Sequence, residues 1–148
     1  MKEIQLVDFN INLLKNRILF SQKINNYRIT FTIYVKSKNN NNWIPIPVKF
    51  DSGASISLFG KDFAKQIGIN KIENDDIVPF KTANNEDIKA YKHKIFFKYD
   101  LTNKKIEYQL DVAITTEFDK KYHLIGLNPF ISQFGIVIDS KMMYIFRQ

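Results

Sequence analysis

One short segment carries residues that can do acid–base chemistry without a metal or a thiol. Asp51-Ser52-Gly53 follows directly on Trp43–Phe50, a largely apolar run that reads WIPIPVKF. A carboxylate at the end of such a strand is held on rigid structure, and glycine lets the backbone turn sharply without a Cβ. Asp51 is therefore the candidate catalytic carboxylate, and the short hydroxyl of Ser52 can bond across to a neighbouring copy of the same loop.

Other common chemistries lack their residues. The chain of 148 residues has no cysteine, which excludes thiol catalysis, disulfides and cysteine-based zinc sites. Its two imidazoles, His93 and His123, lie far apart in sequence and do not have metal-ligand spacing. We expect no metal and no cofactor, and we expect both histidines to be exposed or satisfied within the fold.

Strands must position the aspartate. Arg28–Lys36 and Trp43–Phe50 are rich in β-branched and aromatic residues, and the asparagines of Asn39–Asn42 between them indicate a hairpin loop. In the second run every other residue from Ile44 to Phe50 is apolar, which predicts one buried face. Pro45 and Pro47 lie on the opposite face and cannot donate hydrogen bonds, which favours a partly unpaired strand edge.

The rest of the chain predicts more strands and two short helices. Residues at helical spacing and a following Gly68 indicate a helix over Phe59–Ile67, and Asn128–Phe134 predicts one or two helical turns stopped by Gly135. The further expected strands are Ile77–Lys81, Ile88–Tyr99, Ile106–Thr115, Ile136–Ile138 and Met142–Phe146, with Thr82–Asp87 as a polar turn. The expected fold class is mostly β.

These residues resemble a known family. Asp51-Ser52-Gly53-Ala54 after an apolar strand resembles the active-site loop of retropepsins, the retroviral-type aspartic proteases. His123–Ile131 (HLIGLNPFI) is similar to the later hydrophobic-hydrophobic-Gly segment of that family, and Thr82–Asn85 is similar to the tip of its flap hairpin. The matches cover Arg28–Phe146 in the family's order. The predicted helix at Phe59–Ile67 makes the pattern more like the bacterial and cellular members.

The resemblance implies a retropepsin-like β-barrel with one lobe per chain, a flap hairpin, and activity as an aspartic endopeptidase on protein or peptide substrates. Two adjacent carboxylates can supply a general base for water and an acid for the leaving amine, because like charges so close do not ionise together. The chain has one Asp-Ser/Thr-Gly, so two copies of Asp51 would meet in a homodimer.

The resemblance also assigns roles to individual residues. The implied catalytic loop is Asp51, Ser52 and Gly53, and the implied structural residues near it are Leu124, Ile125 and Gly126. The implied substrate-binding residues are Ala54, Thr82, Ala83, Asn84 and Asn85.

Three positions depart from the family. Many retroviral members carry an Asp after the Ala and an Arg after the later Gly, and the two form an ion pair. Ser55 and Leu127 stand at those places here, so both ends of the ion pair are replaced together. Asn85 stands where glycine is common at the flap tip, and asparagine tolerates left-handed backbone better than most residues.

Bulk properties bound the remaining alternatives. We expect residues 1–27 to form an N-terminal extension of uncertain structure and residues 28–148 the protease domain.

The net charge is +7, but the lysines are scattered and arginine is scarce, so this pattern does not favour a nucleic-acid partner. No membrane span and no signal peptide are recognised, which favours a cytoplasmic protein. The alternative function is a catalytically silent, dimeric peptide-binding module of the same fold.

Overall fold

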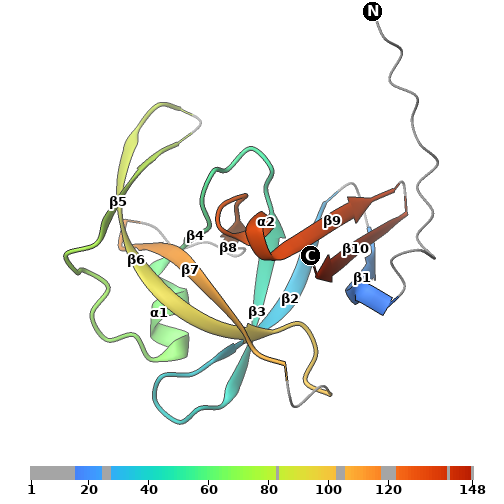
Figure 1. The fold of residues 1–148 in the computed structure, drawn as a ribbon. Coiled ribbons are helices and arrows are strands. Elements are labelled where there is room, and N and C mark those ends of the chain that lie inside the picture. The colour runs from blue at the N-terminus through green and yellow to red at the C-terminus, as the bar shows by residue number, and fades with distance from the viewer. Residues whose placement is uncertain are drawn as a thin grey trace, which may run out of the picture.

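The structure, a computed structural model, describes residues 16–24, 28–82, 84–102, 106–117, 123–139 and 141–147. Within these residues the chain forms ten strands and two short helices, so the predicted mostly β class is confirmed (Figure 1). Ala83, one of the predicted flap residues, lies outside the described residues.

Six strands form a closed barrel. In spatial order they are β2 (Thr30–Lys36), β3 (Trp43–Phe50), β8 (His123–Ile125), β4 (Leu58–Phe59), β7 (Tyr108–Thr115) and β6 (Asp87–Lys98). The barrel closes because β2 also pairs with β6, through Tyr34–Lys98 and Val35–Phe97. A further strand, β5 (Ile77–Lys81), pairs with the first half of β6 and makes a hairpin that extends beyond the barrel.

The hairpin before Asp51 follows the predicted pattern. β2 and β3 pair antiparallel from Thr30–Lys49 to Lys36–Trp43 around the asparagine loop. Ile46, Val48 and Phe50 are buried, whereas Pro45 and Pro47 are exposed. On the other edge, β3 pairs with β8 only over residues 48–50. Over the described residues, the part of that edge that contains the prolines therefore has no strand partner, as the prolines predict.

Helix α1 (Lys61–Ile67) packs Phe63 and Ile67 into the barrel core, and it ends at Gly68 with the left-handed φ of 82° that the sequence predicts. The helix begins later than the expected start at Phe59. The reason is that Leu58 and Phe59 pair in parallel with β7 as strand β4. Tertiary pairing therefore overrides the local helical spacing at these two residues.

A second, three-stranded sheet lies beside the barrel. It contains β1 (Ile18–Lys23), β10 (Met142–Arg147) and β9 (Phe134–Ile138) in that order. β1 falls within the expected N-terminal extension, and the domain boundary between residues 27 and 28 stays a prediction. Helix α2 (Phe130–Gln133) stops before Phe134, which begins β9. Gly135 does not stop the helix; it lies inside β9, where a Cβ would come 2.2 Å from the ring of Phe146.

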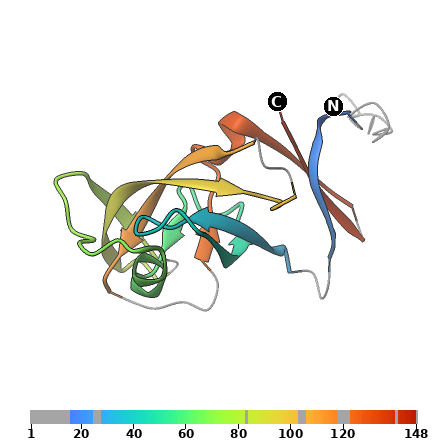
Figure 2. The ribbon, with the colours of Figure 1, turned by 90° about the horizontal axis from the view of Figure 1, so that it is seen from below.

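The β5–β6 hairpin and the three-stranded sheet lie on opposite sides of the barrel. Figures 1 and 2 both show the β5–β6 hairpin at one end and the sheet of β1, β9 and β10 at the other. No helix among the described residues is long and apolar enough to cross a membrane.

Candidate active site

Asp51 stands where β3 leaves the barrel. The last residue of β3, Phe50, pairs with Ile125 of the parallel strand β8, and the Asp51 backbone N–H donates to the Ile125 carbonyl at 3.0 Å. Both Phe50 and Ile125 are buried. The strand pair therefore fixes the backbone of the candidate catalytic residue, while its side chain is only half-buried.

The turn after Asp51 is organised by the aspartate itself. Its Oδ1 accepts a hydrogen bond from the Gly53 N–H at 2.9 Å, and its carbonyl accepts one from the Ala54 N–H at 3.1 Å. A Cβ on Gly53 would lie 3.2 Å from the same Oδ1. Within the described part of the chain, the other carboxylate oxygen has no hydrogen-bond partner, and Ser52 is exposed. Both groups are open to solvent, substrate or a second subunit.

The loop that follows β8 holds this turn in place through backbone hydrogen bonds. The Leu127 N–H donates to the Ala54 carbonyl and the Asn128 N–H to the Ser55 carbonyl, each at 2.9 Å. Ser55 and Leu127 are the two positions that depart from the family's ion pair. Backbone hydrogen bonds join these loops in this chain, so their connection does not depend on that pair of charges.

Gly126 lies where the two loops touch. A Cβ at this position would lie 2.2 Å from the carbonyl oxygen of Ile56, which is backbone and cannot move aside. The Gly126 N–H donates at 3.1 Å to the hydroxyl of Ser57, a side chain that is 1% exposed. Only glycine allows this approach, which explains why the hydrophobic-hydrophobic-Gly segment needs its glycine.

The β5–β6 hairpin forms the predicted flap, and its tip is a tight turn. The Thr82 N–H donates to the Glu86 carbonyl and the Asn85 N–H to the Thr82 carbonyl, each at 2.9 Å. The Thr82 hydroxyl accepts from the Glu86 N–H at 3.1 Å. Asn85 has φ of 64°, which is the left-handed conformation that asparagine tolerates. Thr82 is half-buried, whereas Asn84, Asn85 and Glu86 are exposed.

A cleft of about 730 Å³ separates the flap from Asp51. Of the predicted site residues it brings together Asp51, Gly53, Ala54, Thr82 and Leu124; Ser52, Asn84, Asn85, Ile125 and Gly126 do not line it. The residues of the cleft wall that sequence reasoning missed are Leu58, Phe80, Lys81, Glu86 and Ile88.

The alternation of side chains along the flap strands could have predicted several of the missed residues. Phe80 pairs with Ile88 in the β5–β6 register, and both are half-buried toward the barrel. Side chains alternate between the two faces of a strand, so Glu86, two residues before Ile88, shares its inward face. Leu58 carried no such signal, because the sequence did not predict β4.

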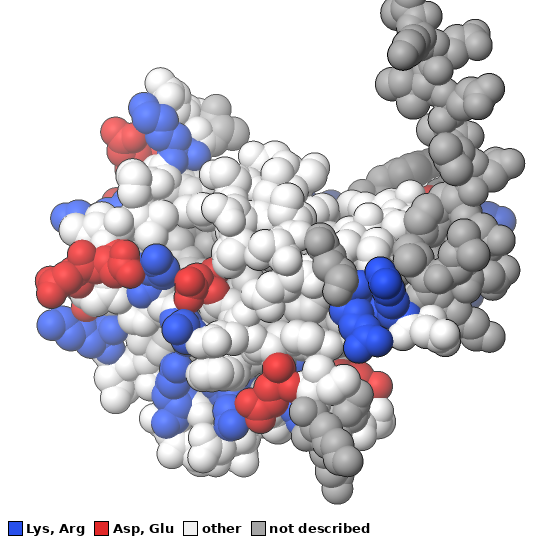
Figure 3. All heavy atoms as spheres, viewed as in Figure 1, with Lys and Arg blue, Asp and Glu red and all other residues white. Residues whose placement is uncertain are grey.

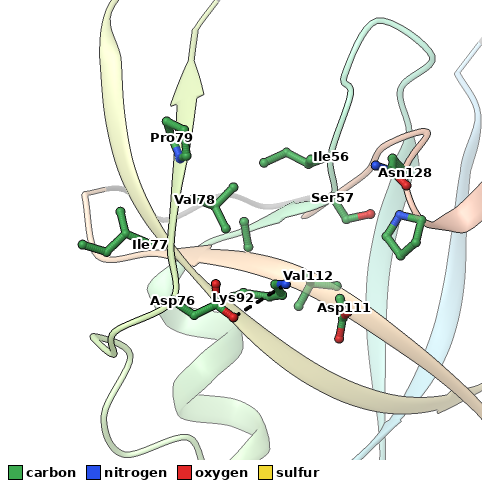
Figure 4. A pocket seen from close by; sticks show the side chains of 12 residues that line it. Ile56, Ser57, Asp76, Ile77, Val78, Pro79, Lys92, Asp111, Val112 and Asn128 are labelled. Carbon is green, nitrogen blue, oxygen red and sulfur yellow. Dashed lines mark ion pairs between the residues drawn. The ribbon is translucent and has the colours of Figure 1, made fainter.

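A separate cavity of about 450 Å³ lies behind the flap. It is bounded by the start of β5, by β7 and by the loops at Ser57 and Asn128 (Figure 4). Asp76 and Lys92 form an ion pair at 3.6 Å on one wall of it, and Asp111 faces it from β7. Asp51 does not line this cavity, so the site that combines the candidate catalytic carboxylate with the flap is the larger cleft.

His123 is satisfied within the fold, as expected. It is 2% exposed, packs against the rings of Phe59 and Phe63, and its Nδ1 accepts a hydrogen bond from the Gly60 N–H at 3.1 Å. Asp62 lies on its other side, with Oδ2 at 3.8 Å from Nε2. These contacts join β8 to the start of α1 and so support the strand on which Asp51 rests.

The comparisons with known proteins agree with this geometry. A retropepsin-like aspartic protease from Rickettsia conorii superposes with a TM-score of 0.59 at 19% identity, over 84% of this chain and 98% of that one. EIAV protease in complex with an inhibitor superposes with a TM-score of 0.50 at 12% identity, over 74% of this chain and 92% of that one. The chain has a retropepsin-like fold. No family model and no curated protein sequence matches it.

Proposed function

We propose that this retropepsin-like chain is an aspartic endopeptidase whose active site is completed by a second copy of itself. The observation that carries the proposal is the position of Asp51. Its backbone is fixed by β8, one carboxylate oxygen is engaged by its own turn, and its side chain faces the flap across a cleft. An extended peptide fits between such a flap and such a carboxylate, and closure of the flap excludes water.

One chain supplies one carboxylate of the required pair. Two adjacent aspartates share the work, since one stays protonated as the acid while the other takes a proton from the attacking water. The water oxygen then forms a bond to the carbonyl carbon, and the protonated carboxyl group delivers its proton to the departing amine nitrogen. In the proposed homodimer the exposed Ser52 hydroxyls and the two Asp51 side chains face each other at the two-fold axis.

The terminal sheet offers a surface that suits a second copy. Met143 and Ile145 of β10 are buried toward the core. The alternate residues Met142, Tyr144 and Phe146 lie on the other face and are half-buried. Aromatic and methionine side chains are enriched at protein interfaces, so these three partly exposed residues support the assembly that we propose.

The test is cleavage of unstructured protein or peptide substrates by the wild-type chain and by Asp51→Asn. The amide is nearly isosteric with the carboxylate but cannot act as a general base, so we expect activity to fall below a few per cent while the circular dichroism spectrum is unchanged. Asp111→Asn is the matched control, because Asp111 faces the cavity behind the flap. Full activity in Asp51→Asn would show that the catalytic assignment is wrong.

The same cleavage assay tests whether the chain works as a dimer and whether it is instead a catalytically silent peptide-binding module. Specific activity should fall on dilution through the dimer dissociation constant, and an excess of Asp51→Asn chains should suppress wild-type activity by forming mixed pairs. Sedimentation velocity measured beside the activity connects the two. A chain that binds peptides in the cleft and cleaves none would instead be the catalytically silent peptide-binding module.

A further inference from the structure

Charge is distributed unevenly between the two faces of the flap. Asp87 lies on the outward face of the tip, and Lys81, its partner in the β5–β6 register, forms an ion pair with it at 3.6 Å. Lys81 also donates to the side-chain carbonyl of Asn85 at 3.4 Å. Lys81 lines the cleft, and its ammonium group is engaged by these two partners at the flap tip.

The inward face of the same tip carries Glu86. It follows the alternation that places Ile88 and Ala90 toward the barrel, and it lines the same cleft as Asp51. Within the described part of the chain, the Glu86 carboxylate has no ion pair and no hydrogen bond. The unpaired charges of the cleft are therefore both negative, at Asp51 on its floor and at Glu86 under the flap.

The turn at the flap tip does not need this carboxylate. Glu86 contributes to the turn through its backbone, since its N–H donates to the Thr82 hydroxyl and its carbonyl accepts from the Thr82 N–H. Glutamine can make both of these bonds equally well. A charged side chain that stabilises nothing in the free chain, and that lines a binding cleft, is suited to recognise a ligand of opposite charge.

We propose that Glu86 selects substrates with a basic side chain beside an apolar scissile pair. Leu58, Phe80, Ile88 and Leu124 supply the apolar wall of the cleft, and Glu86 supplies a carboxylate to an arginine or lysine that lies under the flap. This inference rests on the proposed peptidase function and names its substrate class. A substrate with an acidic residue in the same place would lie beside the unpaired Glu86 carboxylate and be repelled by it.

The experiment uses peptides with an apolar central pair and one variable flanking residue, which is arginine, norleucine or glutamate at each flanking position in turn. At the position that lies under the flap we expect wild-type kcat/KM to be at least about fivefold higher for arginine than for norleucine, and lower still for glutamate. In Glu86→Gln the ratio for arginine over norleucine should fall to about one, and in Glu86→Lys the order should reverse. Each variant is compared only with itself, so a change in overall activity does not affect the ratio.

Asp87→Asn is the matched control. Asp87 is the neighbouring carboxylate and lies on the outward face of the flap, so its loss should leave the ratio as in the wild type. If Asp87→Asn and Glu86→Gln change the ratio equally, the effect is the general charge of the flap and the assignment to Glu86 is wrong. A wild-type ratio near one at every position overturns the inference while the peptidase function stands.

A binding measurement separates the two proposals. Fluorescence anisotropy of the same peptides with Asp51→Asn chains reports recognition without cleavage, and the preference for arginine must appear there and disappear when Glu86→Gln is added. A wild-type chain that cleaves nothing, together with this preference in binding, overturns the peptidase function and supports the role of Glu86. Absence of both cleavage and binding overturns both proposals.

Discussion

The catalytic loop and the flap tip face each other across one cleft, yet they are built in opposite ways. The loop of Asp51–Ser57 takes hydrogen bonds from segments far away in sequence, including Leu127, Asn128 and Ala113. The flap tip of Thr82–Glu86 makes its turn hydrogen bonds within itself. A general base must be held in one geometry, whereas a flap must open to admit substrate. The difference fits the separate roles that we propose for the two regions.

The largest effect should come from breaking the catalytic loop at its point of closest approach. Gly126→Ala places a Cβ against the Ile56 backbone, and the two loops must separate to accept it. We expect the free energy of unfolding to fall by more than about 3 kcal/mol, which for a marginally stable domain includes failure to fold. Urea denaturation followed by circular dichroism measures the change.

Gly53→Ala is the matched control within the same site. Its Cβ would meet only the Asp51 carboxylate, at 3.2 Å, and a side chain can adjust by a few tenths of an ångström. This variant should remain folded. Equal destabilisation of the two variants would mean that the close approach at Gly126 is not what locks the loops.

A smaller effect is expected at the flap tip. Asn85 has a left-handed backbone, so Asn85→Ala adds roughly 1 kcal/mol of strain to the turn whereas Asn85→Gly adds none. Because the turn hydrogen bonds described at the tip lie within the hairpin itself, the strain should appear as local opening. Hydrogen exchange of the Glu86 amide should become about fivefold faster in Asn85→Ala, with the urea midpoint little changed. Loss of global stability as large as that of Gly126→Ala would refute the distinction between the regions.

The smallest change in stability is expected at a third turn. A side chain accepts backbone hydrogen bonds there as at the flap tip, but the acceptor is a charged carboxylate. Asp139 Oδ1 accepts the N–H groups of Lys141 and Met142, each at 2.7 Å, at the turn between β9 and β10. These hydrogen bonds hold the pKa of Asp139 below its usual 3.8. A lowered pKa in the folded state stabilises the fold above pH 3.8, and the contribution is lost as the pH falls through the lower folded-state value.

Asp139→Asn should therefore lower Tm slightly at pH 7, and the difference from the wild type should shrink as the pH falls below 3.8. Tm measured by differential scanning calorimetry across that range tests the sign. The flap tip uses the neutral hydroxyl of Thr82 in the same way, so Thr82→Ala should show no such pH dependence. A difference between wild type and Asp139→Asn that grows toward low pH would contradict the assignment.

Elements whose identity is local could be predicted from the sequence. Trp43–Phe50 and Ile77–Lys81 match β3 and β5 residue for residue, because strict alternation and flanking turn residues determine them. The candidate site followed the same rule. Asp51 after an apolar strand and Gly126 after Leu124 and Ile125 are marked by their neighbours in the chain.

Pairings between distant segments could not be predicted in this way. Phe59 has helical spacing with Phe63 and Ile67, yet with Leu58 it forms a strand because β7 offers the two residues partners. Ile18–Lys23 has no local signal for its place, which is set by pairing with β10 at the other end of the chain. Local pattern reports which face of a segment is apolar, but it does not report which other segment covers that face.

The sequence by itself marked Asp51 as the candidate catalytic carboxylate and predicted the strands that have a clear local pattern, such as Trp43–Phe50. The chain carries a single Asp-Ser-Gly, which is the reason we propose that a second copy completes the site. Only the tertiary structure decided that Glu86 lies in the same cleft as Asp51 and that Lys81 forms an ion pair with Asp87. The physical reason is that neighbouring residues of a strand point to opposite faces. The position of the β5–β6 hairpin on the barrel decides which of those faces points into the cleft.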